Sequence, residues 1–191
     1  MSNYFTFFPK IGYDLEKTNN KVQLTNILRR FAFDKDTQNK LDTYYSYTIQ
    51  HGDRPDTIAE KYYGSSKYDW IVLLYNKILH PTFDWPLFGE DFNRYIIKKY
   101  GSLQTAYETT EKYFKIVRER QKTSYIDIPE KILEIDETTY NTLTENKRRS
   151  YSAYEWEVIQ NDERTEIKLL DSSYLDTLLS EVENILREDI Y

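Results

Sequence analysis

Apolar side chains recur three or four residues apart in several stretches of the chain, the spacing that places them on one face of a helix. Between these stretches the chain is polar, as over residues 14–23 and 34–42, which we interpret as loop and solvated connector. The most regular stripe is the last one and indicates a strongly amphipathic terminal helix. The stripes predict helices over residues 24–31, 54–63, 66–78, 90–100, 102–113 and 173–188.

The second and third of these helices have the clearest boundary signals. Asp53 can cap the first of the pair, with Asp56 at the third helical position, and Gly64 can stop it. Ser66 is the predicted cap of the next helix, and His80–Pro81 is the predicted end.

Alternation with a period of two predicts strands elsewhere. In the N-terminal run Tyr4-Phe5-Thr6-Phe7-Phe8, rings fall on both sides of an extended strand, which favours burial on both faces. Residues 43–50, rich in Tyr and Thr, predict a second strand.

The C-terminal half changes from helical to alternating pattern at residue 113. Short strands are predicted over residues 113–135, followed by a helical turn at 136–143 and a charged loop at 145–150. Residues 152–159 and 165–170 are predicted to pair as a hairpin.

Composition narrows the function classes. Aromatic residues make up 16% of the chain, with 19 Tyr, a residue type that suits both cores and protein interfaces. The formal net charge is −6, so bulk attraction to nucleic acid or to an anionic membrane is not expected. The sequence contains no Cys, which removes disulfides, thiolate nucleophiles and Cys-ligated metals.

Catalytic chemistry finds little support. Acids lie near one another in the sequence, such as Asp84 with Glu90 or Asp91, and Glu155 with Glu157, but a chain with 32 acidic residues brings such pairs together by chance. The five Gly are too widely spaced for a phosphate-binding loop. No catalytic residue and no cofactor is predicted.

Metal and nucleic-acid sites are equally weak in the sequence. His51 and His80 lie in no ligand motif, so we predict no metal site. The basic clusters Arg29-Arg30 and Lys147-Arg148-Arg149 are short, and we interpret them as solvated surface or as salt-bridge partners of another subunit.

Residues 43–80 resemble the first two thirds of a LysM module: a strand, a Gly-Asp turn, a short helix with a Gly stop, and a second helix ending at Asn. LysM modules often bind polymers of N-acetylglucosamine. The usual closing strand is not found in the stretch that follows, where a turn with Trp85 stands, so the unit is interpreted as a packing scaffold without glycan affinity. The residues of this resemblance are Gly52, Asp53, Ile58, Ala59, Tyr63, Gly64, Trp70 and Asn76.

A longer resemblance covers nearly the whole chain. The aromatic peptide at 4–9, the LysM-like unit, the turn at 83–87, the segment 152–157 and Ile167-Lys168-Leu169-Leu170 before a last helix follow in order. This order is similar to that of the small LysM-containing baseplate wedge proteins of contractile-tailed, T-even-like phages.

The resemblance implies a structural, non-enzymatic subunit of the virion tail baseplate. Such a subunit would join adjacent wedges around the hub and would contact other wedge and hub-proximal subunits in multiple copies. It would be assembled in the host cytoplasm. The alternative function is a glycan-binding LysM module that engages the host cell wall, and a cell-wall hydrolase is a weaker third.

We therefore expect an α+β fold: a LysM-like βαα unit with added helices, a small β-containing C-terminal part and a terminal amphipathic helix. The expected parts are residues 1–42 (N-terminal arm and helix), 43–113 (LysM-like unit with helical extension) and 114–191 (strand-rich part plus C-terminal helix). Trp70 is expected in the core, against Ile58 and Leu74.

Exposed aromatic residues are the candidates for contact with partner subunits. The first dozen residues are expected to leave the body of the protein and dock on another subunit; the alternative is that their rings fold back onto the predicted helix at 24–31. The candidate interface residues are Tyr4, Phe5, Phe7, Phe8, Trp85, Tyr154 and Trp156.

Overall fold

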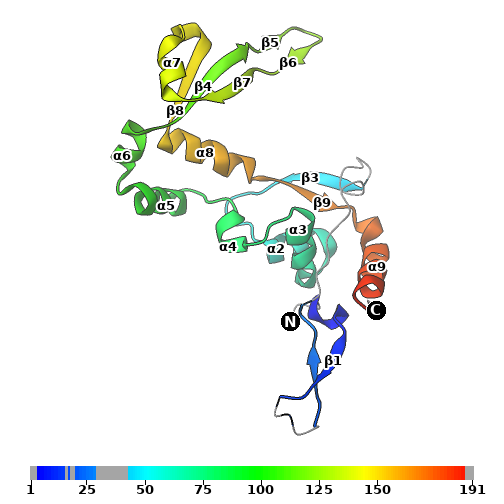
Figure 1. Cartoon of the computed structure of the whole chain (residues 1–191). Helices are drawn as coiled ribbons and strands as arrows, with labels where there is room; N and C mark the ends of the chain where they lie inside the picture. Colours follow the sequence, from blue (N-terminus) through cyan, green and yellow to red (C-terminus); the bar gives the residue numbers. More distant parts are fainter. Residues whose placement is uncertain (1–3, 16, 18–19, 29–42, 188–191) are drawn as a thin grey trace. The chain divides into compact units, whose positions relative to one another are not determined.

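The computed structural model describes residues 4–15, 17, 20–28 and 43–187, which mix helices and strands as expected of an α+β fold (Figure 1). Its contacts form two compact units: unit 1 comprises residues 1–85 and 165–191, and unit 2 comprises residues 86–164. These boundaries differ from the three expected parts, because the last strand and helix belong with the N-terminal half rather than with the strand-rich part.

Unit 1 contains two antiparallel strand pairs, β1 with β2 and β3 with β9, and a set of short helices. The α-helices α2, α3 and α9 carry most of its buried apolar side chains. The elements are η1 (Tyr4–Phe7), β1 (Lys10–Tyr13), β2 (Val22–Thr25), β3 (Tyr44–Thr48), α2 (Pro55–Tyr63), η2 (Ser66–Tyr68), α3 (Asp69–Tyr75), α4 (Pro81–Asp84), β9 (Glu166–Leu170), η4 (Ser172–Tyr174) and α9 (Leu175–Arg187).

The pairing of β3 with β9 joins the two sequence ends of unit 1. Tyr44 lies opposite Leu170 and Thr48 opposite Glu166, in an unbroken antiparallel register. The strand predicted at 43–50 is thus confirmed. The predicted hairpin of 152–159 with 165–170 is wrong: the first segment is helical, and β9 takes a partner far away in the sequence.

The core of unit 1 is one apolar cluster. Trp70 and Ile71 of α3 meet Leu170 of β9 and the inner face of α9, where Val182 is fully buried. Trp70 is 7% exposed, which confirms its predicted burial; Leu74 packs against the same cluster, whereas the expected contact with Ile58 stays a prediction. The amphipathic stripe of the last helix is confirmed, since α9 buries it here.

Unit 2 begins with two helices and continues as a three-stranded antiparallel sheet with the order β7-β4-β8. A small strand pair, β5 with β6, extends from it, and α7 and α8 complete the unit. The elements are α5 (Glu90–Tyr100), α6 (Leu103–Glu108), β4 (Thr110–Arg118), β5 (Gln121–Lys122), β6 (Asp127–Ile128), β7 (Lys131–Ile135), α7 (Glu137–Thr142), η3 (Glu145–Lys147), β8 (Arg148–Ser152) and α8 (Ala153–Glu163).

The helix α5 shows why this part of the prediction is confirmed. Glu90 and Asp91 lie in its first turn and Lys98 and Lys99 in its last, so charges complement the helix dipole at both ends. Its inner face buries Ile96 against α6 and α8. The predicted strands over 113–135 and the helical turn at 136–143 are confirmed by β4, β7 and α7.

Three boundaries in unit 2 and its flanks need correction. The helix predicted over 102–113 ends at Glu108, because β4 has already begun at Thr110. The charged loop predicted at 145–150 contains the start of β8, which pairs with β4. The segment from residue 153 is α8, begun by a capping box in which Ser152 N–H donates to Glu155 at 2.8 Å and Glu155 N–H donates to Ser152 at 3.2 Å.

Unit 1 also departs from the predicted helix signals. Leu24 lies in strand β2 rather than in a helix over 24–31, of which residues 29–31 fall outside the described residues. Helix α2 starts after Arg54, whose N–H donates to Thr57 Oγ1 at 2.9 Å, so Asp53 is not the cap. Ser65, not Ser66, accepts the capping hydrogen bond of the next helical segment.

Candidate interaction surfaces

The N-terminal rings pack within unit 1. Tyr4 and Phe7 place their ring centroids 5.1 and 6.1 Å from that of Trp70, and Phe8 is 6% exposed in the same cluster. The segment forms the short helix η1 rather than the expected extended strand, whereas docking of these residues on another subunit stays a prediction. Among these rings only Phe5 stays on the surface, at 57% exposure.

Asp53 organises the turn after β3. Its carboxylate accepts hydrogen bonds from Tyr47 Oη at 2.7 Å and from Gln50 N–H at 2.8 Å. Gly52 supports this turn with a φ of +90°, a conformation that other residues rarely adopt. Burial and, next, the hydrogen bond to Asp53 raise the pKa of Tyr47 to about 12. Asp53 therefore acts as a structural residue of the turn.

The remaining residues of the LysM resemblance lie in the core or at helix ends. Ile58 and Ala59 are buried on α2, and Gly64 stops this helix at a φ of +74°. Tyr63 donates from its hydroxyl to the Leu170 carbonyl of β9 at 3.1 Å. Burial, as the largest cause, raises the pKa of Tyr63, which keeps this hydroxyl a donor.

Asn76 connects the end of α3 to β9. Its amide nitrogen donates to the carbonyls of Val72 and Lys168, each at 2.8 Å, and its amide oxygen accepts the Lys168 N–H at 2.7 Å. One side chain thus satisfies both backbone groups of a strand residue that lies far away in the sequence. The resemblance pointed to Asn76, but its partner strand could not be identified from the residues.

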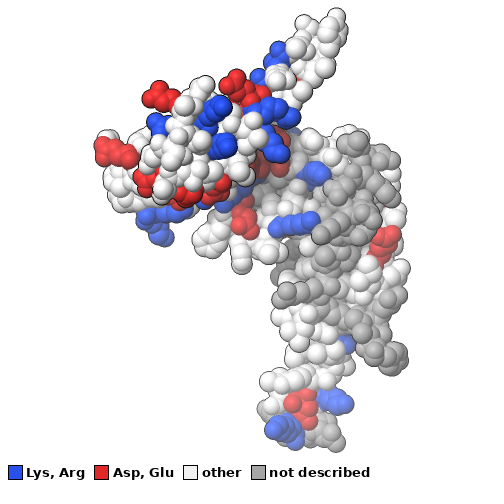
Figure 2. Space-filling view, turned by 45° about the horizontal axis from the view of Figure 1, so that its top comes forward, with Lys and Arg blue, Asp and Glu red and all other residues white. Residues whose placement is uncertain are grey.

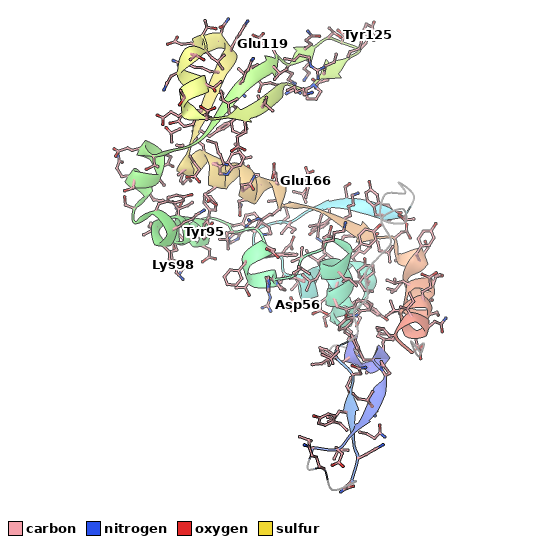
Figure 3. All side chains as sticks on the ribbon, in the orientation of Figure 1. Asp56, Tyr95, Lys98, Glu119, Tyr125 and Glu166 are labelled. Carbon is pink, nitrogen blue, oxygen red and sulfur yellow. The ribbon has the colours of Figure 1, made fainter. Side chains whose placement is uncertain are left out.

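Trp85 lies at the end of α4, where its indole N–H donates to the Asp53 carbonyl at 3.0 Å. It lines an open hollow of about 430 Å³ together with Arg54 and Asp56 at the start of α2 and Leu73 within α3. Asp56 is in ion-pair contact with Arg54 at 3.3 Å (labelled in Figure 3). This hollow presents both apolar and charged groups to a small ligand.

Tyr154 and Trp156 both pack within unit 2. The Tyr154 ring stacks on Tyr107 with centroids 4.2 Å apart. Trp156 reaches the sheet from α8, with its ring 5.8 Å from Phe114, and the Lys112 ammonium lies 5.6 Å from the Trp156 ring. Their rings are mainly occupied by intramolecular contacts.

A buried charge cluster in unit 2 went unpredicted. Glu157 of α8 is 8% exposed and receives hydrogen bonds from Lys99 at 2.5 Å, Tyr100 at 3.0 Å and Tyr95 at 3.1 Å. Figure 3 labels Tyr95 on α5, facing α8. These groups are far apart in sequence, and no short motif marks them; the only signal was the acid itself on a helix that was predicted as a strand.

The electrostatics of this cluster are those of a satisfied ion pair. Burial raises the pKa of Glu157. The hydrogen bonds from Lys99 and Tyr100 lower it by more than burial raises it, so the net shift of the pKa is downward. The hydrogen bond to Glu157 in turn raises the pKa of Lys99. A carboxylate held ionised by three donors suits helix-to-helix anchoring rather than proton transfer.

The acids that the sequence brought near one another have structural tasks. Glu155 closes the capping box of α8, and Asp84 accepts the His80 N–H at 3.0 Å. Within the described residues, no group of three or more His, Asp or Glu could hold a metal ion. A search of the same residues for a helix long and apolar enough to cross a membrane also found none.

Exposed apolar side chains also lie on two strand pairs of the described residues. In the β1–β2 pair, Ile11 lies opposite Leu24 and Tyr13 opposite Val22, so all four side chains share one face, and all are exposed. In unit 2, Tyr125 is 96% exposed between β5 and β6 (labelled in Figure 3). Contiguous exposed apolar side chains are typical of surfaces that another protein covers.

Comparison with known proteins gives two matches over almost the full chain. A family model described as base plate wedge protein 53 matches residues 3–185. Baseplate wedge protein gp53 of Enterobacteria phage T4 is 25% identical over 197 residues, covering 96% of each of the two chains.

Proposed function

The chain belongs to the base plate wedge protein 53 family and is a structural subunit of a phage baseplate, and from this we propose that it joins adjacent wedges around the hub of a contractile tail. Its place is the virion tail baseplate, with other baseplate subunits as partners. The match over residues 3–185 is the observation that carries the proposal, because it includes both compact units.

The two units support a joining role. Each has its own apolar core, so each can present a stable surface to a different neighbour. The exposed apolar face of β1–β2 and the exposed Tyr125 lie in different units and offer contact area of the kind found at interfaces. We place these contacts in the host cytoplasm during assembly and in multiple copies around the tail axis.

We further propose that unit 1 contains a LysM-like module closed by β9. The order β3, α2, α3 matches the first part of the resemblance, and the antiparallel pairing of β9 with β3 supplies a closing strand from beyond unit 2. Asn76 and Tyr63, both residues of the resemblance, bond to β9. The module then serves as a scaffold into which unit 2 is inserted.

Ring closure of wedges is the direct test of the proposed function. Wedges assembled from all other subunits should stay separate in sedimentation and electron microscopy, and adding the purified chain should close them into rings. Closed rings in equal yield without this chain would overturn the proposal.

Glycan binding is the second candidate, favoured only by the hollow beside Trp85. We expect no saturable retention of the chain on insoluble peptidoglycan or chitin, and no lytic activity. The Asp56→Ala variant tests the hollow itself, because Asp56 lines it and is only half-buried, so the substitution should leave the fold intact. Saturable binding that this variant loses would favour the glycan-binding module over the scaffold.

A further inference from the structure

One face of the three-stranded sheet of unit 2 carries basic residues. Lys115 of β4 lies opposite Leu133 of β7 and opposite Arg148 of β8, and Arg118 lies opposite Lys131 after a bulge. Directly opposed residues point to the same side of a sheet, and so do alternate residues of one strand. These five residues, which we call the basic face, therefore share one side of the sheet.

Glu134 of β7 and Glu130, which precedes this strand, are engaged on the other side. Phe114, the neighbour of Lys115, points to the side covered by α8. There Glu134 receives Lys112 at 2.6 Å, and Glu130 receives both terminal nitrogens of Arg149, at 2.5 and 3.0 Å. The carboxylates of Glu130 and Glu134 are thus held on the opposite side from the basic face.

The four bases of this face have no acid within ion-pair distance among the described residues. Arg118 donates to the Pro129 carbonyl at 3.3 Å, and Arg148 lies 4.7 Å from the Tyr140 ring centroid. Like charges directly opposite each other are destabilising. The sheet contains two such pairs, Lys115 with Arg148 and Arg118 with Lys131.

We propose that the basic face binds an acidic protein surface on another baseplate subunit. Figure 2 shows several Lys and Arg side chains over the strand-rich part of unit 2, with Asp and Glu side chains beside and below them. An acidic partner relieves both like-charge pairs, which gives the unfavourable arrangement a physical reason. The identity of the partner as a baseplate subunit rests on the proposed function.

The surroundings favour a protein over nucleic acid as the occupant. Leu133 is 58% exposed amid the bases and Val117, beside Arg118, is 52% exposed, so apolar contact area lies within the patch. Phosphate backbones offer charge but little apolar surface to match.

Charge reversal tests the proposal, because it separates docking from folding. Lys115→Glu places an acid opposite Arg148, and Arg118→Glu places one opposite Lys131. Each variant should melt at the same temperature as the parent chain or above it. Incorporation into baseplates should fall at least about tenfold, since like-charge contact with an acidic partner costs more than about 1.4 kcal/mol.

Lys98→Glu is the matched control, with the same charge change on the exposed side of α5 (Figure 3). It should incorporate like the parent chain. If the melting temperature of either Glu variant is below that of the parent chain, the corresponding Gln variant, Lys115→Gln or Arg118→Gln, is used in its place. Binding of the Gln variants to immobilised wedges should depend less on salt concentration than binding of the parent chain.

The outcomes distinguish this proposal from the proposed function. Normal incorporation of both Glu variants, while the parent chain still closes rings, overturns the basic face alone. Failure of the parent chain to close rings overturns the proposed function. Retention of duplex DNA by the parent chain but not by the variants would overturn the protein partner, as would self-association of the parent chain that the variants lose.

Discussion

Units 1 and 2 solve the same packing problem in different ways. Unit 2 is one continuous segment, residues 86–164, whose strands β4, β7 and β8 follow one another with short connections. Unit 1 is assembled from both sides of that segment, and its β3–β9 pair has unit 2 between its strands in the sequence. Contacts between distant residues require closure of long loops, so unit 1 should form after unit 2 during folding.

The two cores also differ in chemistry. Unit 1 relies on aromatic and aliphatic burial around Trp70 and α9, with Asn76 as a polar tie. Unit 2 adds a buried ionic cluster around Glu157 to a smaller apolar core. The comparison teaches that unit 1 should be sensitive to loss of apolar volume, whereas unit 2 should be sensitive to pH.

The largest expected effect is that of Trp70→Ala. Truncation of a buried Trp costs about 3–5 kcal/mol of unfolding free energy, and here it opens the cluster that joins α3 to α9. Amide hydrogen exchange should accelerate in β3 and β9 but not in β4. Trp156→Ala is the control, and it should accelerate amide exchange in β4 but not in β3 or β9. If either variant accelerated exchange equally in both units, the two units would unfold together and the comparison would be wrong.

Phe8→Ala comes next. Phe8 is 6% exposed, so Phe8→Ala should lower the unfolding free energy of unit 1 by about 3 kcal/mol. Phe5 is 57% exposed, so Phe5→Ala should lower it by less than about 1 kcal/mol. Urea denaturation measures both. Equally small losses of unfolding free energy for the two variants would show that both rings lie outside the monomer's own core. That result would favour an N-terminal arm that docks on another subunit.

Asn76→Ala should have an intermediate effect on unit 1. It leaves the Lys168 N–H and two carbonyls without this partner, and an unsatisfied buried group costs about 1–3 kcal/mol. The control in unit 2 is Asn161→Ala, whose amide bonds to both backbone groups of Leu87. Thermal melts should show each loss in its own unit, and faster exchange in β9 for the Asn161 variant would contradict the division.

The smallest expected effect concerns Glu157. Because the net pKa shift of Glu157 is downward, its charged form stabilises folded unit 2 above the unfolded pKa of about 4.3, and this stability is lost as the pH falls through the lower folded pKa. Glu157→Gln should cost about 1–2 kcal/mol at pH 7. Melting temperatures from pH 7 to pH 3 should converge for the two proteins, and a constant difference across this range would contradict the ionic role.

The sequence by itself determined the elements whose signals are local. The stripes of α5 and α9, the alternation of β3 and the Gly64 stop depend on neighbours within one or two turns, and they are found as predicted. Burial of Ile58, Ala59 and Trp70 was likewise predictable from stripe and resemblance. Ser152 and Glu155 formed a readable capping box as well, which the strand prediction for that segment overlooked.

Only the tertiary structure decided which distant segments meet. The strand at 166–170 carries no local mark of its partner, and pairing with β3 follows from the apolar surface that α3 and α9 bury beneath it. The sequence alone places the N-terminal rings on both sides of an extended strand. In the structure, the Tyr4 and Phe7 rings pack against Trp70 within the same unit. Glu157 and Lys99 become partners only once α5 and α8 pack together. The packing buries Glu157, and a buried charge without a partner is costly, so the pair depends on the tertiary structure and not on any local sequence signal.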